Sequence, residues 1–130
     1  MKLRATTRSL QDSHKNENGN PTERIYYLQT VDEEIQDIPF EEIIFICSGV
    51  KYGLLELHRK EDQLNFRGYI SRVALGIPFF FHSHTSFVVN INHIEHIDEI
   101  NRTLTLSGGK LVPIAKTKIK RVRYLMGTLK

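Results

Sequence analysis

The amino-acid sequence predicts a mostly β protein, built from antiparallel sheets with one short internal helix and a basic C-terminal helix. Short runs of branched and aromatic residues recur along the chain, as they do in strands. Turn-forming residues separate these runs at hairpin spacing, and strands joined by hairpins pair in antiparallel fashion. With 130 residues, 40% of them hydrophobic, the chain can form one domain with a modest core.

The first 22 residues are polar and rich in turn-forming residues, so we expect a linker or disordered lead-in, with a frayed helix within residues 6–15. The domain itself is placed at residues 23–130. The apolar run at residues 43–47 is unbroken, which is typical of a strand buried on both faces. The first half of the domain predicts five strands, at residues 24–30, 34–38, 43–47, 54–58 and 63–67.

Residues 68–75 predict the short internal helix, because their apolar side chains recur on one face over about two turns. Pro113 cannot donate to a ladder, so the last strand should lie at a sheet edge. The second half predicts two strands within residues 79–90 and others at residues 94–100, 103–106 and 110–114. The closing helix, at residues 115–126, should face inward with Ile119, Val122, Leu125 and Met126.

Residues 79–90 are the most distinctive stretch, because two apolar runs flank the polar quintet at residues 82–86. The quintet carries histidines and hydroxyls but no acid, and it should lie where the chain leaves the core. Such hydrogen-bond donors suit an anionic partner. The plainer alternative is a hairpin corner whose polar groups satisfy the backbone. Asn90, at the end of the second run, is expected to close the next turn by hydrogen bonds.

Charge is distributed unevenly along the chain. Residues 110–130 hold seven of the 18 Lys and Arg residues and none of the 15 acids, which leaves the rest of the chain at net −4. A basic end on a mildly acidic body presents a preferred face to polyanions. The alternative is a solvated helix whose lysines serve only solubility.

The single cysteine, Cys47, excludes a disulfide-stapled scaffold and indicates a reducing, cytoplasmic setting. It lies in an apolar run and is expected to be a small buried hydrophobe. No apolar run approaches the roughly 20 residues of a membrane helix, and no secretory signal is visible, so no membrane partner is expected.

No nucleotide motif and no cofactor site can be recognised, and we expect neither enzyme activity nor a bound metal. Two enzymatic alternatives remain. A Ser86–His84–Asp98 hydrolase would lack a nucleophile elbow. A metal-dependent enzyme would lack interleaved cysteines or carboxylates at ligand spacing, and would centre on His82, His84, His93 and His96. A third alternative is a protein–protein interaction module that uses the apolar edge at residues 112–114.

A nucleic-acid interface uses more of the sequence at once. The quintet supplies donors, Lys51 lies in a glycine-containing loop at residues 48–53, and Lys116 opens the basic helix after an edge strand. Lysine neutralises phosphates, and small polar side chains and histidine can read base edges or phosphates. Because neither a helix-turn-helix pattern nor zinc-finger spacing is present, the contacts would come from loops of a β-scaffold.

The segment F-F-H-S-H-T-S-F-V-V-N at residues 80–90, followed by I-E-H-I-D at residues 94–98, resembles the signature of LytTR-type DNA-binding domains. The turn and strand at residues 108–114, with Lys116 after them, are similar to the family's closing motif. The lead-in F-R-G-Y-I at residues 66–70 is most similar to the quorum-sensing and bacteriocin-regulating branch. The resemblance extends over nearly the whole ordered part of the chain, from about Arg24 to Met126.

The resemblance implies an elongated stack of antiparallel sheets with about ten strands. It also implies the output domain of a two-component response regulator, preceded by a receiver domain. Such domains bind double-stranded promoter DNA as homodimers on direct repeats, and insert loops into successive major grooves. The DNA contacts would be Lys51, Tyr52, Gly53, His82, His84, Thr85, Ser86, Lys116 and Lys120.

Three of these positions depart from the family pattern. The family often has arginine at the place of His82 and a histidine or charged residue at the place of Gly53. It usually has arginine at the place of Lys116, and lysine lacks arginine's bidentate reading of guanine. DNA binding is compatible with these changes, but they leave the base preference open.

Overall fold

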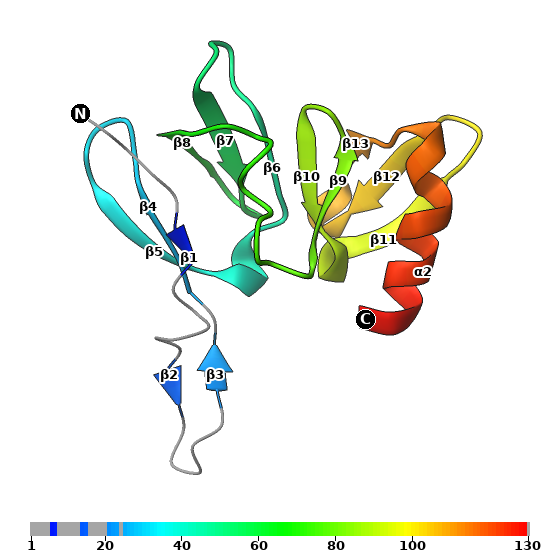
Figure 1. Ribbon diagram of the computed structural model, residues 1–130, viewed down its shortest axis with the longest axis horizontal. Coiled ribbons are helices and arrows are strands. Elements are labelled where there is room, and N and C mark those ends of the chain that lie inside the picture. Colours follow the sequence, from blue (N-terminus) through cyan, green and yellow to red (C-terminus); the bar gives the residue numbers. More distant parts are fainter. Residues whose placement is uncertain (1–5, 8–13, 16–20, 24, 130) are drawn as a thin grey trace.

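The computed structural model describes residues 6–7, 14–15, 21–23 and 25–129. Ten strands lie between residues 25 and 113, all pairs of neighbouring strands are antiparallel, and one α-helix, α2 (Ile119–Leu129), follows them. Figure 1 shows the sheets side by side along the long axis of the molecule, with α2 at the far end. The predicted fold class, a mostly β stack of antiparallel sheets, is therefore confirmed.

The N-terminal sheet is a hairpin of β4 (Ile25–Gln29) and β5 (Ile35–Pro39), with β1 (Thr6–Thr7) paired to the other side of β4. A second, separate pair joins β2 (His14–Lys15) to β3 (Pro21–Glu23). Most of the predicted lead-in and of its frayed helix lies outside the described residues. The parts that are described are extended strands and not helical.

The central sheet carries the stretch singled out above. Its strand order is β8–β7–β6–β10–β9. The hairpin of β9 (Phe80–His84) and β10 (Phe87–Asn90) therefore docks on β6 (Phe45–Ser48), far away in sequence. The register places Phe87 opposite Cys47 and Val89 opposite Phe45. Beyond β6 lie β7 (Leu54–His58) and β8 (Gln63–Arg67), whose bounds match the predicted strands.

The C-terminal sheet is formed by β11 (Ile94–Asp98), β12 (Thr103–Leu106) and β13 (Lys110–Pro113), in that order. Pro113 thus lies on an edge strand, as predicted. Helix α2 follows the short 3₁₀ turn η4 (Lys116–Lys118). Its Ile119 and Val122 are buried in the core beside this sheet, with Leu125 and Met126 packed against it, as the sequence indicated.

Two hydrophobic cores lie on opposite faces of the central sheet, and β6 contributes to both. Ile46 points into the first core, against the N-terminal sheet, while Phe45 and Cys47 point into the second, against the C-terminal sheet. Val88 and Val89 of β10 divide in the same way, as the two-residue period of a strand requires. The prediction of a strand buried on both faces is confirmed. Burial of each Ile, Val or Phe side chain contributes about 1.5–3 kcal/mol to the free energy of unfolding.

Asn90 joins these layers by hydrogen bonds. Its side-chain Nδ2 donates to the carbonyl oxygens of Phe40 (3.1 Å) and Ile43 (3.0 Å), at η1 (Phe40–Glu42) and just after it. Its Oδ1 accepts from the N–H of Asn92 (3.0 Å) and caps η2 (Ile91–His93). Asn90 is 1% exposed. The prediction that Asn90 closes a turn is confirmed, and the residue also holds a second, distant turn.

The predicted internal helix at residues 68–75 is wrong. Residues 70–76 form successive turns, with the N–H of Arg72 donating to Tyr69 O (2.9 Å) and that of Leu75 to Arg72 O (3.2 Å). A segment this short, ended by Gly76 at φ +76°, gains too few hydrogen bonds to nucleate an α-helix. Burial of Val73 and Ile77 in the first core holds the segment in these turns instead.

Candidate nucleic-acid interface

Two backbone hydrogen bonds bring the three sequence-predicted contact segments onto one surface. The N–H of Ser48, at the end of β6, donates to Ser86 O (3.0 Å) in the turn of the β9–β10 hairpin. The N–H of Ala115, just before η4, donates to Ser83 O (2.8 Å) in β9. The loop after β6, the hairpin turn and the start of the basic helix are thus neighbours, and the two loops lie at the same end of the sheet in Figure 1.

The loop at residues 49–53 is held in a tight conformation. The N–H of Gly49 donates to Leu54 O (2.7 Å), and a Cβ at Gly49 would lie only 3.0 Å from that oxygen. Gly53 has a φ of +86°, which favours glycine. At the tip, Lys51 is exposed and Tyr52 is 93% exposed. A rigid loop therefore presents one cation and one aromatic ring to the solvent.

A neighbouring segment supports the Tyr52 ring. The ring of Tyr69 lies 5.4 Å from that of Tyr52, and the N–H of Gly68 donates to Gly53 O (2.9 Å). Tyr69 lies within the segment predicted as a short helix with one apolar face, but it is 48% exposed. Its position beside the loop was missed because the turns at residues 70–76 turn it outward. Tyr69 joins the candidate interface.

His84 is fixed by the turn that it precedes. Its Nδ1 accepts from the N–H of Ser86 (3.3 Å) and lies 3.4 Å from the Thr85 hydroxyl, while its ring packs edge-on against Phe87 at 6.0 Å. In a neutral imidazole with Nδ1 accepting, Nε2 carries the proton and is the donor. Nδ1 thus satisfies the backbone of its own hairpin turn, as the plainer alternative expects, whereas the Nε2–H is the donor available to an anionic partner.

The quintet is less exposed than the sequence indicated. Thr85 is exposed, but His82, His84 and Ser86 are half-buried, and Ser83 is fully buried with no hydrogen-bond partner for its Oγ among the described atoms. Burial and the nearby charge of Lys118 lower the pKa of His82, so the imidazole is neutral at pH 7. His82 therefore offers a hydrogen-bonding group and not a positive charge.

The start of α2 is suited to an anion. Its first turn holds no acid, and basic residues precede it, although a helix N-terminus ordinarily favours acidic side chains. Lys116 and Lys120 are exposed, and Lys118 lies over the Phe81 ring at 5.7 Å. Of the described basic residues after residue 109, only Arg123 forms an ion pair, with Glu99. Lys116, Lys118 and Lys120 therefore form no ion pair with a described acidic residue.

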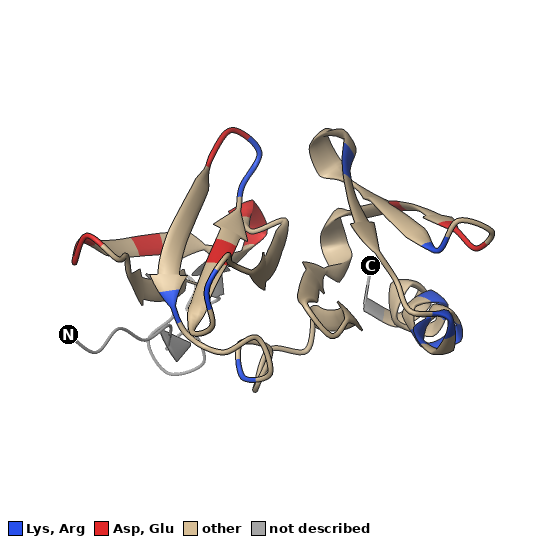
Figure 2. Cartoon of the chain, turned by 90° about the horizontal axis from the view of Figure 1, so that it is seen from above, with Lys and Arg blue, Asp and Glu red and all other residues tan. Residues whose placement is uncertain are grey.

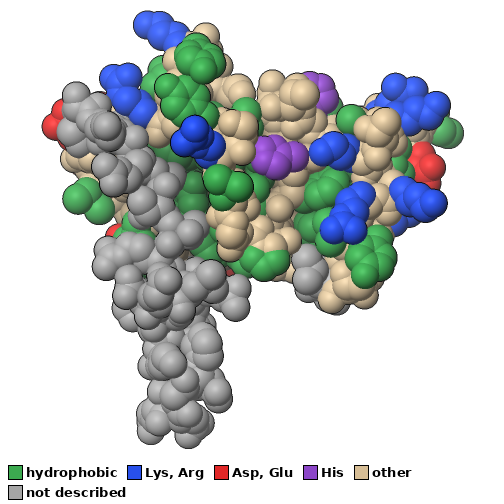
Figure 3. All heavy atoms as spheres, viewed as in Figure 1, with side chains coloured by type: hydrophobic (Ala, Val, Ile, Leu, Met, Phe, Trp, Pro, Cys, Tyr) green, Lys and Arg blue, Asp and Glu red, His purple; other side chains and the backbone are tan. Residues whose placement is uncertain are grey.

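The distribution of charge over the surface agrees with this placement. On the face shown in Figure 3, Lys, Arg and His side chains are spread from the top of the molecule to the helix, and acidic side chains lie mainly at the edges. Seen from above, acidic residues occupy the β4–β5 and β11–β12 turns, while several basic residues lie on α2 (Figure 2). A polyanion would meet the three segments with little repulsion.

Neither enzymatic alternative is supported by the positions of the residues proposed for it. Asp98 accepts hydrogen bonds from the N–H (3.0 Å) and Nδ2 (2.9 Å) of Asn101, and these bonds lower the pKa of Asp98. Its carboxylate therefore stabilises the β11–β12 turn and does not orient His84. The Nε2–H of His93 donates to the Glu41 carbonyl. Among the described residues, a single cluster of potential metal ligands is present, and it includes none of the four histidines proposed from the sequence.

The interaction-module alternative is also weakened. Val112 and Ile114, the apolar edge proposed for it, are buried at 1% and 2% exposure in the second core. Pro113 between them is half-buried, and Leu111, which precedes this edge, is 65% exposed.

Fold and surface together define a β-scaffold domain whose loops and basic helix start present hydrogen-bond donors and lysines on one surface. Comparison with known proteins makes this specific: the model of the LytTr DNA-binding domain family matches residues 33–127, and the chain belongs to that family. A solved LytTr DNA-binding domain from Bacillus cereus has the same fold, with a TM-score of 0.63 and 24% identity over 79% of this chain and 96% of that one.

Curated relatives include two proteins named accessory gene regulator protein A. The one from Staphylococcus epidermidis is 28% identical over 85 residues, which cover 65% of this chain and 36% of the relative. The one from Staphylococcus aureus is 34% identical over 65 residues, which cover 50% of this chain and 27% of the relative. The matched part thus spans about a third of the length of these relatives. None of the helices in the described part of this chain could span a membrane.

Proposed function

We propose that this domain binds double-stranded promoter DNA in a sequence-specific manner and serves as the output domain of a two-component response regulator in the cytoplasm. The observation that carries the proposal is the surface formed when backbone hydrogen bonds from Ser48 and Ala115 join three donor-bearing segments. Membership of the LytTr DNA-binding domain family supports it. The name of the staphylococcal relatives supports a role in gene regulation. In this proposal a receiver domain precedes the DNA-binding domain in the full-length protein.

In this proposal the segments divide the work. The tip of the loop, with Lys51 and Tyr52, and the hairpin turn, with the Nε2–H of His84 and the Thr85 hydroxyl, enter the major groove, where base edges differ in donors and acceptors. Lys116 and Lys120 contact phosphates beside the start of α2. Gly53 and Ser86 shape the two loops, and the neutral His82 donates to a base or a phosphate.

The DNA target should be a direct repeat bound by two copies of the domain. Each copy presents one compact surface, so a head-to-tail pair of half-sites would be read by two copies in the same orientation. Repeats about one helical turn apart, or about 10.5 base pairs, place both surfaces on one side of the duplex.

The test is selection from a pool of random duplexes, followed by titration of the enriched duplex at two salt concentrations. Affinity should fall steeply as salt rises, because each neutralised phosphate adds about −0.9 to the slope of log K against log salt. A duplex with one half-site should bind a single copy more weakly than the repeat binds two. A failure to enrich any sequence, or binding that is insensitive to salt, would refute the proposal.

A further inference from the structure

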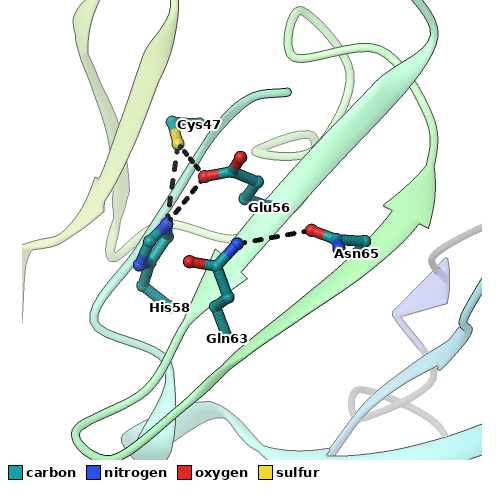
Figure 4. Close-up of polar contacts among 5 residues, drawn as sticks. All are labelled: Cys47, Glu56, His58, Gln63 and Asn65. Atoms are coloured by element: carbon teal, nitrogen blue, oxygen red, sulfur yellow. Dashed lines mark hydrogen bonds and ion pairs between the residues drawn. The ribbon is translucent and has the colours of Figure 1, made fainter. Parts of the chain in front are cut away.

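Three potential metal ligands converge on one face of the central sheet, outside the candidate interface. Cys47 lies on β6, and Glu56 and His58 lie on β7 (Figure 4). The Sγ of Cys47 is 3.4 Å from Glu56 Oε1 and 3.8 Å from His58 Nε2, and the latter two atoms are 3.1 Å apart. No pattern in the sequence places these residues together without the register of the β6–β7 hairpin.

The strand pairing fixes the cluster. Cys47 is directly opposite Glu56, and His58 is opposite Phe45, so all their side chains project from the same face. The His58 ring stacks on Phe45 with ring centres 4.2 Å apart and planes at 8°. Cys47 is buried, whereas Glu56 and His58 are 26% and 17% exposed. The cluster therefore has a hydrophobic floor and remains accessible from solvent.

The spacing of the three atoms matches tetrahedral coordination. Zn²⁺ binds thiolate sulfur at about 2.3 Å, imidazole nitrogen at about 2.0–2.1 Å and carboxylate oxygen at about 2.0–2.2 Å. At tetrahedral angles these lengths give separations of about 3.6 Å for S–N, about 3.6 Å for S–O and about 3.4 Å for N–O. The three separations in the structure are 3.8, 3.4 and 3.1 Å. Shifts of a few tenths of an ångström would complete the geometry.

We propose that Cys47, Glu56 and His58 bind one Zn²⁺ ion, with water in the fourth position. The set combines a soft sulfur with nitrogen and oxygen donors, which suits Zn²⁺ better than Mg²⁺ or Ca²⁺. On binding, the thiol proton is released to solvent, and the imidazole proton resides on Nδ1 while Nε2 ligates the metal.

A nucleophilic triad does not account for the cluster. In such a triad the carboxylate orients the imidazole through one ring nitrogen while the nucleophile meets the other. Here the carboxylate of Glu56 and the thiol of Cys47 both meet Nε2 of His58. Burial and the adjacent Glu56 also raise the pKa of Cys47 to about 12, which is the reverse of an activated thiol.

The position of the cluster gives the metal a consequence for DNA binding, which rests on the proposed function. Cys47 immediately precedes Ser48, whose N–H holds the hairpin turn through Ser86 O. A metal ion joining β6 to β7 at this point would stiffen the base of the loop that carries Lys51 and Tyr52. Metal binding itself is a property of the domain without DNA, so it can be tested independently.

The test uses untagged domain freed of metal and titrated with Zn²⁺, and with Co²⁺ as a spectroscopic probe. We expect one equivalent to bind, a thiolate-to-cobalt charge-transfer band, and a higher melting temperature with Zn²⁺. Cys47→Ala should abolish the charge-transfer band. Glu56→Gln and His58→Gln should each weaken affinity by about 100-fold or more, because losing only an outer partner of a metal ligand costs about 10–100-fold. Glu56→Gln keeps the size of a side chain that is 26% exposed, so this variant should preserve the fold.

His96→Gln is the matched control, because His96 is an exposed histidine on β11 and lies outside the cluster. It should bind both metals like the unaltered domain. The proposal fails if the unaltered domain binds no metal, if Cys47→Ala keeps the charge-transfer band, or if His96→Gln loses affinity as fully as His58→Gln. None of these results bears on DNA binding by the three-segment surface.

Discussion

The two ends of the β9–β10 hairpin are built in opposite ways. At the open end, Asn90 is buried, and its side chain donates two hydrogen bonds and accepts one. At the closed end, His84 and Thr85 reach the surface, and His84 uses one ring nitrogen for its own turn. The same pair of strands therefore ends in a structural anchor on one side and in free donors on the other.

The difference shows how stability and binding can be separated within one hairpin. Hydrogen bonds of a buried amide stabilise the fold, because breaking them leaves polar groups without water. Exposed donors form hydrogen bonds with water, so they contribute little to the stability of the fold and remain available to a partner. Substitutions at the open end should therefore change the free energy of unfolding, and those at the closed end should change DNA affinity.

The largest effect is expected for Asn90→Ala. It removes two donors to buried carbonyls and the cap of η2, so the free energy of unfolding should fall by about 2–4 kcal/mol. Urea denaturation measures this change. Asn92→Ala is the control, because Asn92 is exposed and contributes its backbone N–H. If Asn90→Ala unfolds at the same urea concentration as the control, the open end is not an anchor.

His84→Ala should produce the next largest effect, on binding. Loss of the Nε2–H donor should weaken binding to the selected duplex by about 1–2 kcal/mol, with a smaller loss on unrelated DNA. Fluorescence anisotropy measures both affinities, and urea denaturation should show little change. His96→Ala, which removes an exposed histidine on β11, should bind like the unaltered domain. Equal losses on both duplexes would mean that His84 does not read bases.

Lys116→Ala should have a smaller and different effect. Removal of one phosphate contact should weaken all duplexes by a similar factor and reduce the salt slope by about 1. Anisotropy titrations at several salt concentrations measure the slope. Lys60→Ala, which removes an exposed lysine between β7 and β8, should leave the slope unchanged. An unchanged slope for Lys116→Ala would remove the helix start from the interface.

Ser83→Ala should have the smallest effect. The Ser83 side chain is fully buried and its Oγ has no hydrogen-bond partner among the described atoms, so replacement by a methyl group loses no bond. Its contribution to the interface is a backbone carbonyl, which alanine retains. Stability should stay within about 0.5 kcal/mol or rise slightly, and DNA affinity should not change. A loss of affinity would show that the hydroxyl acts in binding.

Local pattern predicted most of the fold. The strands β7, β8 and β12 have the predicted bounds, because alternation and flanking turn residues specify them without distant contacts. The segment at residues 68–75 was mispredicted because its apolar residues meet the spacing of a helix, whereas Val73, with Ile70 and Ala74 beside it, is placed by packing in the first core. Periodicity located the buried Val73 but not the exposed Tyr69, because tertiary contacts decide the backbone of this segment.

The candidate site was predictable as three segments but not as one surface. The exposed Lys51, Thr85 and Lys116 could be named from loop positions and charge. Their proximity depends on backbone bonds between residues far apart in sequence, which no local pattern reveals. The cluster at Cys47 was missed for a related reason. Without the cross-strand register, Glu56 and His58 are only polar positions of an alternating strand.

The bonds from Ser48 to Ser86 and from Ala115 to Ser83 use main-chain atoms only. They set the distances between the loop, the turn and the helix start without requiring particular side chains at the contact positions. Spacing and chemistry are therefore independent properties of this domain. Side chains such as those of Tyr52, His84 and Lys116 could be exchanged to suit another base sequence while the intervals between contacts stay the same.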